Sequence, residues 1–256
     1  MSSIRVEGLT KRFGDTVALR DVSFEIPEGE FVVVLGTSGS GKSTLLRCLN
    51  GLTRATEGEI FIGDEPVTGP REDVSMVFQQ HNIIGQMSAY GNALTGSLAR
   101  TPFLRSLLQM NSREDKLRAL EALETVGLLE ESRQRARQMS GGQQQRVGIA
   151  RALVQESSTL LADEPVASLD PASAGTVMEY LRTAATERGL TALVSLHQVN
   201  LARQFGQRFI GLSDGELVFD GYRDEFTVDE IDRIYGEIDT ESLISDSDDA
   251  SEAVTS

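Results

Sequence analysis

The stretch GTSGSGKST, residues Gly36–Thr44, follows the apolar run FVVVL at Phe31–Leu35. This run is β-branched, is too short for a core helix and ends at a glycine, so it predicts a buried parallel strand. After the stretch, Leu45, Leu46 and Leu49 recur at helical spacing. A glycine-rich turn between a strand and a helix is the context of a phosphate-binding loop. We therefore predict a nucleoside triphosphate site, the alternative being a chance glycine-rich turn.

The residue types of this loop suit phosphate. Its glycines permit unusual backbone angles and let amide N–H groups gather around anionic oxygens, and the helix N-terminus adds its positive end. Lys42 can reach the β- and γ-phosphates, and the Ser43 hydroxyl can ligate Mg²⁺. The candidate ATP-binding residues of the loop are Gly36, Thr37, Ser38, Gly39, Ser40, Gly41, Lys42, Ser43 and Thr44.

The composition predicts one globular domain with an appendage. The chain has 256 residues, of which 39% are hydrophobic, enough to bury a core. No apolar run reaches the roughly 18 residues that span a membrane. The N-terminal MSSIRVEGL has no signal-peptide core, so we expect a cytosolic chain. The single cysteine, Cys48, is expected to be a small core residue.

The formal net charge of −15 is unusual for a protein that binds the polyanion ATP. Of the 24 basic residues only Lys11, Lys42 and Lys116 are lysines. An acidic, lysine-poor surface suits a salty cytosol, because the Debye length falls to ~3 Å at 1 M salt and self-repulsion is screened. We interpret the charge as halophilic adaptation, the alternative being an ordinary acidic protein, and we expect no nucleic-acid partner.

The last residues are acidic and rich in serine, and no basic residue follows Arg233. Such a composition buries little surface. We therefore assign residues 1–236 to one ATP-binding domain and expect residues 237–256 to be a disordered tail.

Strand and turn signals alternate as far as about Gln79, beginning with short strands around Gly14 and Asp15. Residues of about 82–154 have helical character. Strand–helix alternation then returns at TLLADEP, at a helix from Asp170 to about Arg188, and at TALVSLH. We therefore predict an α/β core with a helical insertion.

Two local signals refine this prediction. Ser112 is expected to cap a helix that ends at Gly127, and Asp214 with Gly215 predicts a β-hairpin. The apolar face of the helix after Ser112 is expected to consist of Leu117, Leu120, Leu123 and Val126.

TLLADEP predicts a second buried strand, residues 159–162, which carries two carboxylates at its end. Ligands of α/β sheets bind at the carboxyl ends of the strands. Asp163 suits Mg²⁺, directly or through water, and Glu164 suits polarising the attacking water. The alternative is a pair of surface acids in a loop.

Three further residues are candidates because the chain also contains the phosphate loop and the two carboxylates. Gln79, in MVFQQ at the end of a third apolar run, can bridge Mg²⁺, water and a moving segment. His197, after a strand expected beside the Asp163 strand, can hydrogen-bond the γ-phosphate. Phe13 either stacks on adenine or is a core phenylalanine.

MSGGQQQR predicts a second anion site. Ser140 is expected to cap a helix whose first turn contains Gly141 and Gly142. If this helix belongs to a separate helical subdomain, it cannot serve the phosphate of its own loop. A head-to-tail pair, in which Ser140 of each chain closes on the ATP of the other, solves the problem.

In combination, GTSGSGKST, MVFQQ, MSGGQQQR, TLLADEP, ASLDP and SLHQ resemble the ATP-binding subunits of ABC transporters over about residues 3–236. The resemblance implies a P-loop NTPase fold: a RecA-like core, an antiparallel β subdomain and an inserted helical subdomain. Two departures, Met139 for leucine and Thr37 for proline, supply no catalytic atom. The implied roles are phosphate binding by Lys42 and the loop amides, Mg²⁺ and water binding by Ser43, Gln79 and Asp163, general base catalysis by Glu164, γ-phosphate contact by His197, contact with the partner's ATP by Ser140 and Gly142, and coupling across the dimer by Asp170.

A closer similarity is to the ATP-binding subunits of phosphonate importers, and TPFLRSL, residues 101–107, is its most telling segment. It implies a homodimer on the cytoplasmic face of the membrane, with two permease subunits and an external substrate-binding protein. Import of phosphite, phosphate or another oxyanion stays open.

Two other classes fit less well. A soluble ABC ATPase of DNA repair or translation usually carries coiled-coil insertions or two cassettes. A small-molecule kinase or GTPase leaves the helix after Ser140, and His197, without a role.

Overall fold

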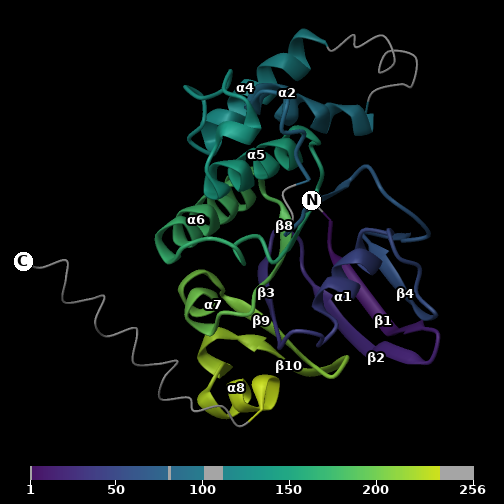
Figure 1. Cartoon of the computed structure of the whole chain (residues 1–256). Coiled ribbons are helices and arrows are strands. Elements are labelled where there is room, and N and C mark those ends of the chain that lie inside the picture. The colour runs from purple at the N-terminus through teal and green to yellow at the C-terminus, as the bar shows by residue number, and fades with distance from the viewer. Residues whose placement is uncertain (1, 80–81, 101–111, 237–256) are drawn as a thin grey trace, which may run out of the picture.

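The computed structural model describes residues 2–79, 82–100 and 112–236. Their strands form two sheets, with a helical part at one end (Figure 1). This architecture confirms the predicted α/β class with an antiparallel subdomain and a helical insertion. The tail at 237–256 and the TPFLRSL segment lie outside the described residues.

The larger sheet has six strands in the order β10-β9-β3-β8-β7-β6, and all neighbours are parallel except β9 and β10. The phosphate-loop strand β3 is central, because it pairs with β8 on one side and β9 on the other. The bounds are β3 (Phe31–Leu35), β6 (Val74–Val77), β7 (Thr159–Asp163), β8 (Thr191–Ser195), β9 (Arg208–Ser213) and β10 (Glu216–Tyr222).

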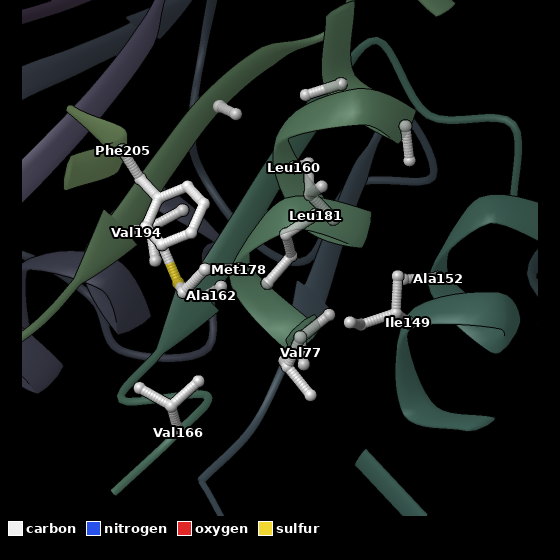
Figure 2. Close-up of a cluster of buried hydrophobic side chains, with 14 of the residues drawn as sticks. Val77, Ile149, Ala152, Leu160, Ala162, Val166, Met178, Leu181, Val194 and Phe205 are labelled. Carbon is white, nitrogen blue, oxygen red and sulfur yellow. The ribbon is translucent and has the colours of Figure 1, made fainter. Parts of the chain in front are cut away.

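Both faces of this sheet are buried, as expected for parallel strands. Val33 and Leu35 belong to the core cluster that includes the helices α5 (Gly141–Val154) and α6 (Pro171–Arg188), whereas Val32 and Val34 belong to the cluster beneath α1 (Lys42–Leu49). Figure 2 shows side chains of α6 pointing onto those of β7 and β8 in the first cluster. Cys48 of α1 is 1% exposed and, as predicted, is a core residue; burial raises the pKa of its thiol to about 11.

The smaller, antiparallel sheet has the order β2-β1-β4-β5. Its bounds are β1 (Ile4–Phe13), β2 (Thr16–Ile26), β4 (Glu57–Ile62) and β5 (Glu65–Pro66). The turn at Gly14 is confirmed, but the expectation of short strands is wrong: β1 and β2 have 10 and 11 residues. Gly8 and Asp21 adopt positive φ at irregularities inside the strands rather than at their ends.

The helical part consists of α2 (Ala89–Leu94), η1 (Thr95–Arg100), α4 (Arg113–Thr125), η2 (Ala136–Gln138) and α5. Ser112 caps α4 as predicted, in a capping box with Asp115. The predicted apolar face of α4 is partly wrong, because Leu117 and Leu120 are exposed. The buried face is made by Ala119, Ala122, Leu123 and Val126, since the close packing of α2, α4 and α5 favours alanine.

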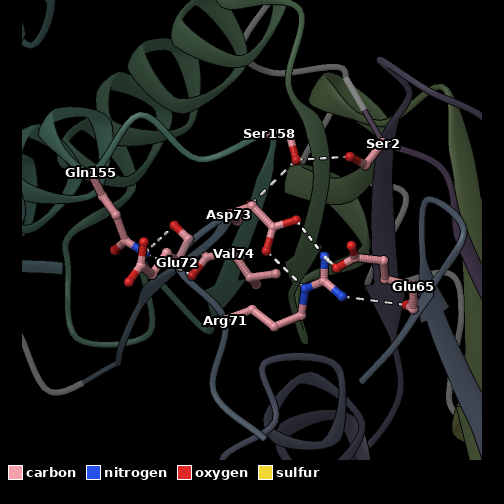
Figure 3. Close-up of polar contacts among 8 residues, drawn as sticks. All are labelled: Ser2, Glu65, Arg71, Glu72, Asp73, Val74, Gln155 and Ser158. Carbon is pink, nitrogen blue, oxygen red and sulfur yellow. Dashed lines mark hydrogen bonds and ion pairs between the residues drawn. The ribbon is translucent and has the colours of Figure 1, made fainter. Parts of the chain in front are cut away.

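Polar contacts join the two sheets around Arg71 (Figure 3). Its guanidinium donates two hydrogen bonds of 2.8 Å to Asp73, just before β6, and lies 3.2 Å from Glu65 of the small sheet. Hydrogen bonding to Arg71 lowers the pKa of Asp73. Gln155, after α5, donates to the Val74 carbonyl of β6. The N-terminal sheet, the core and the helical part are thus connected at one edge.

The C-terminal third confirms the remaining local predictions. Asp170 caps α6, which ends at Arg188, and Asp214 and Gly215 both adopt positive φ in the β9–β10 hairpin. The chain then forms η3 (Arg223–Glu225) and α8 (Val228–Tyr235), while α7 (Val199–Phe205) lies between β8 and β9 in sequence.

Candidate functional site

The phosphate loop begins where β3 ends and turns into α1. Gly41 has φ 102°, and a Cβ there would lie 2.7 Å from the Ala18 carbonyl oxygen, so only glycine fits. Lys42 is 4% exposed, and its Nζ donates to the carbonyl oxygens of Gly36 at 2.8 Å and Thr37 at 2.9 Å. The loop therefore folds back around its own lysine.

Lys42 also faces the predicted general base. Its Nζ lies 3.6 Å from Oε1 of Glu164, whose side chain is 21% exposed. Burial lowers the pKa of Lys42, and the negative charge of Glu164 partly offsets this effect. The two residues predicted from separate motifs are thus one charge pair.

A hydroxyl group of β8, that of Ser195, connects the Asp163 carboxylate with the backbone of Glu164. Ser43 Oγ donates to Asp163 Oδ1 at 2.8 Å, and Ser195 Oγ donates to the same oxygen at 3.1 Å. The Ser195 oxygen in turn accepts the backbone N–H of Glu164 at 2.9 Å. Ser195 is fully buried, and sequence reasoning missed it because its place depends on the pairing of Asp163 with Ser195 between β7 and β8.

Glu164 occupies an unusual backbone conformation, with φ 45°. A non-glycine residue in the left-handed region costs of order 1 kcal/mol and persists only where its surroundings hold it. The hydrogen bond from Glu164 N–H to Ser195, and the bond from Ala167 N–H to the Glu164 carbonyl at 3.3 Å, hold it here. In this conformation the chain leaves β7 with the Glu164 carboxylate 3.6 Å from Lys42 Nζ.

His197 lies just after the end of β8, and β8 pairs with β7, the strand of Asp163, as predicted. His197 is exposed, and its backbone carbonyl accepts a hydrogen bond of 3.1 Å from the hydroxyl of Tyr235. Burial raises the pKa of Tyr235, and the charge of Glu164 contributes to the increase. Tyr235 was not among the predicted site residues, because only the docking of α8 brings it here.

Gln79 and Phe13 lie on the surface. Gln79 is exposed in a bend after β6, and the preceding carbonyl, of Phe78, accepts a long hydrogen bond of 3.5 Å from Gln145 of α5. Phe13 is 54% exposed at the end of β1, with Lys11 Nζ 4.7 Å from its ring centroid. Phe13 is therefore not a core phenylalanine.

Ser140, Gly142 and Asp170 form a second group, at two helix N-termini. Ser140 caps α5 in a capping box with Gln143, and its residue is exposed. Asp170 caps α6 by accepting the Ser173 N–H at 3.0 Å, and hydrogen bonding to the side chain and then to the backbone of Ser173 lowers the pKa of Asp170. A Cβ on Gly142 would lie 3.4 Å from Ser173, so the two caps are neighbours. Their described hydrogen bonds stay within these turns and do not reach the phosphate loop.

Two observations concern membranes and metals. Within residues 2–79, 82–100 and 112–236, no helix combines the length and apolarity needed to cross a membrane. In the same part of the chain, no group of three or more His, Cys, Asp or Glu side chains is arranged to hold a metal ion. Any divalent ion at Ser43 and Asp163 would therefore need further oxygen ligands.

The chain is similar to known proteins over most of its length. A family model described as ABC transporter matches residues 19–167. The Phosphonates import ATP-binding protein PhnC of Halobacterium salinarum is 66% identical over 95% of this chain and 87% of the relative. The Phosphonates import ATP-binding protein PhnC 2 of Haloquadratum walsbyi is 61% identical over 100% of this chain and 91% of the relative. Both organisms are halophilic archaea, in agreement with the halophilic interpretation of the charge.

A solved structure resembles the described fold. The ATP-binding cassette MJ0796, in a dimeric post-hydrolysis state bound to ADP and Pi, is 35% identical with a TM-score of 0.74. The alignment covers 87% of this chain and 100% of that one.

Proposed function

Since the chain belongs to the ABC transporter family of ATP-binding proteins, we propose that it is the ATP-hydrolysing subunit of an importer and drives the uptake of phosphonates. The assignment of phosphonates as the cargo rests on a single observation. The chain is 66% and 61% identical to two relatives named as phosphonate import subunits, over nearly the whole of each chain. Phosphite, phosphate or another oxyanion is the alternative cargo.

The described residues fit a magnesium nucleotide. The buried Ser40 hydroxyl of the phosphate loop has no hydrogen-bond partner among the described residues, so it has a donor to offer. Ser43 and Asp163 would hold Mg²⁺, because hydroxyl and carboxylate oxygens are its preferred ligands. When bound, Mg²⁺ neutralises phosphate charge. The role assigned to Gln79 is to complete this set from the loop after β6.

The loop residues Gly36–Thr44 bind the phosphates of ATP, with Phe13 stacking on the adenine. Lys42 Nζ neutralises phosphate charge, and in doing so it exchanges the carboxylate of Glu164 for phosphate oxygens. Glu164, freed from the pair, accepts a proton from the attacking water. His197 contacts the γ-phosphate and orients it.

Two copies of the chain complete each other's sites. Ser140 and Gly142 lie at an exposed helix N-terminus, which suits contact with the ATP of a partner chain. Asp170, beside them, couples the two sites across the dimer. The dimeric state of the related cassette MJ0796 supports this arrangement.

The importer would contain two transmembrane permease subunits and an external substrate-binding protein. The dimer of this chain would bind the permeases at the cytoplasmic face of the membrane. Loading of the binding protein leads to closure of the dimer on two ATP, and hydrolysis at Glu164 resets it. The segment TPFLRSL contributes to the cargo assignment only through its sequence.

Growth on a phosphonate as the sole phosphorus source tests the function. Deletion of the gene should abolish growth, and the restored gene should recover it, whereas a restored Glu164→Gln copy should not. Growth of the deletion strain on phosphite, on phosphate and on other oxyanions is measured in parallel. If the deletion strain grows normally on phosphonates but fails on phosphate or another oxyanion, the cargo assignment is wrong and the ATPase mechanism stands.

A further inference from the structure

The last described helix, α8, packs on the core sheet where Gly211 of β9 leaves space for a side chain. Its apolar residues Ile231 and Ile234 are 2% and 0% exposed. A Cβ on Gly211 of β9 would lie 2.5 Å from Ile234 Cδ1, so the glycine makes room for this side chain. Even an alanine at position 211 would force the Ile234 side chain, or α8 with it, to shift. The position of α8 along β9 is therefore closely defined.

This docking brings the end of α8 to the phosphate loop. Gly211 pairs with Leu35, the last residue of β3, and Gly36 follows directly. Tyr235, the residue after Ile234 and the last of α8, therefore lies level with the start of the loop. Leu196, between β8 and His197, donates its N–H to the Val34 carbonyl at 2.9 Å, so the His197 segment lies at the same level.

The Tyr235 hydroxyl contacts the His197 segment of the ATP site, because it donates to the His197 carbonyl at 3.1 Å. Burial raises the pKa of this phenol, with a contribution from Glu164, so it stays protonated and remains a donor. No other described side chain has a hydrogen bond to the His197 backbone in this structure.

We propose that Tyr235 is a positioning residue of the ATPase: its hydroxyl holds the His197 backbone beside Gly36 and Glu164, and thereby orients the imidazole toward the γ-phosphate. Through this bond, the seating of α8 on β9 controls the hydrolytic site. The proposal rests on the function proposed above for His197.

Steady-state ATP hydrolysis by full-length Tyr235→Phe tests the proposal. The variant keeps the ring and loses only the hydroxyl. We expect kcat to fall about 3- to 10-fold, the factor of one ordinary hydrogen bond, while KM for ATP changes less than about 2-fold. Tyr222→Phe is the control, because it removes a phenol hydroxyl at the end of β10, where Tyr222 is 52% exposed and pairs with Arg208 at the start of β9. It should keep the kcat of the unaltered chain.

Histidine NMR provides a readout that a merely structural role would not move. The chain has two histidines, His81 and His197, so ring-labelled protein gives two sets of signals. Tyr235→Phe should shift the His197 signals and leave those of His81 in place, and Tyr222→Phe should shift neither. Unchanged His197 signals, or an unchanged kcat, in Tyr235→Phe would overturn the proposal.

The His197→Ala variant separates the two levels of inference. If it is inactive while Tyr235→Phe is fully active, the proposal for Tyr235 alone is overturned. If His197→Ala is itself fully active, the role of His197 and the proposal fall together.

Discussion

Replacing Ser195 with alanine tests whether a buried hydroxyl of β8 organises the hydrolytic carboxylates. Ser195 is fully buried, donates to Asp163 Oδ1 at 3.1 Å and accepts the Glu164 N–H at 2.9 Å. Ser195→Ala removes both bonds and introduces no new bulk. The Glu164 amide would then lack the partner that holds its left-handed conformation.

Two magnitudes follow from these contacts. An unsatisfied buried N–H costs about 1–3 kcal/mol, and the midpoint of thermal unfolding falls by about 2–4 °C per kcal/mol for a domain of this size. A hydrogen bond to a charged group contributes about 1.5–3 kcal/mol. If that contribution is lost from the transition state, kcat falls roughly 10- to 100-fold.

Ser75→Ala is the control that separates stability from catalysis. Ser75 is 1% exposed on β6 of the same sheet, and its hydroxyl lies 2.7 Å from Ser157 Oγ and donates to the Thr159 carbonyl at 3.3 Å. Both variants should lose stability to a similar extent, measured by calorimetry in molar KCl. Only Ser195→Ala should lose ATP turnover. Equal kcat values for the two variants would refute the positioning of Glu164 by Ser195.

Three other outcomes are expected. Glu164→Gln should lower hydrolysis by ~10²-fold or more and accumulate as an ATP-bound dimer in size-exclusion chromatography; near-normal hydrolysis would remove Glu164 from the mechanism. Mixing Lys42→Ala chains with Ser140→Arg chains should yield heterodimers with one intact site, and crosslinking of Ser140 to the Lys42 of its own chain would contradict the head-to-tail arrangement. The midpoint of thermal unfolding should rise with KCl, because the charge of −15 is screened; a flat or falling midpoint would exclude halophilic adaptation.

Local signals in the sequence predicted those features that depend on neighbouring residues. The strand Phe31–Leu35 and the capped helix that begins after Asp170 were confirmed, as was the turn at Asp214. Each of these depends on a short apolar run, a cap or a turn residue. The order of motifs then indicated that Lys42 and Glu164 belong to one site, and the structure places them 3.6 Å apart.

Features that depend on contacts between elements distant in the chain could not be predicted from the sequence. Ser195 is an ordinary serine in an apolar run until β8 pairs with β7. Tyr235 ends a short helix whose position depends on Gly211. The exposed Leu117 and Leu120 were assigned to the core because period alone does not distinguish an alanine-lined interface from a leucine-lined one.

The central position of β3 has a consequence for synthesis on the ribosome. Val33 of β3 pairs with Val194 of β8 and Phe209 of β9, so both neighbours of the nucleotide-binding strand emerge long after it. Until β9 has left the exit tunnel, one edge of β3 has no strand to pair with, whereas the β1–β2 hairpin can form at once. Nucleotide should therefore be able to stabilise only a nearly finished chain, and a polypeptide arrested before Ser213 would be open to proteolysis with or without ATP.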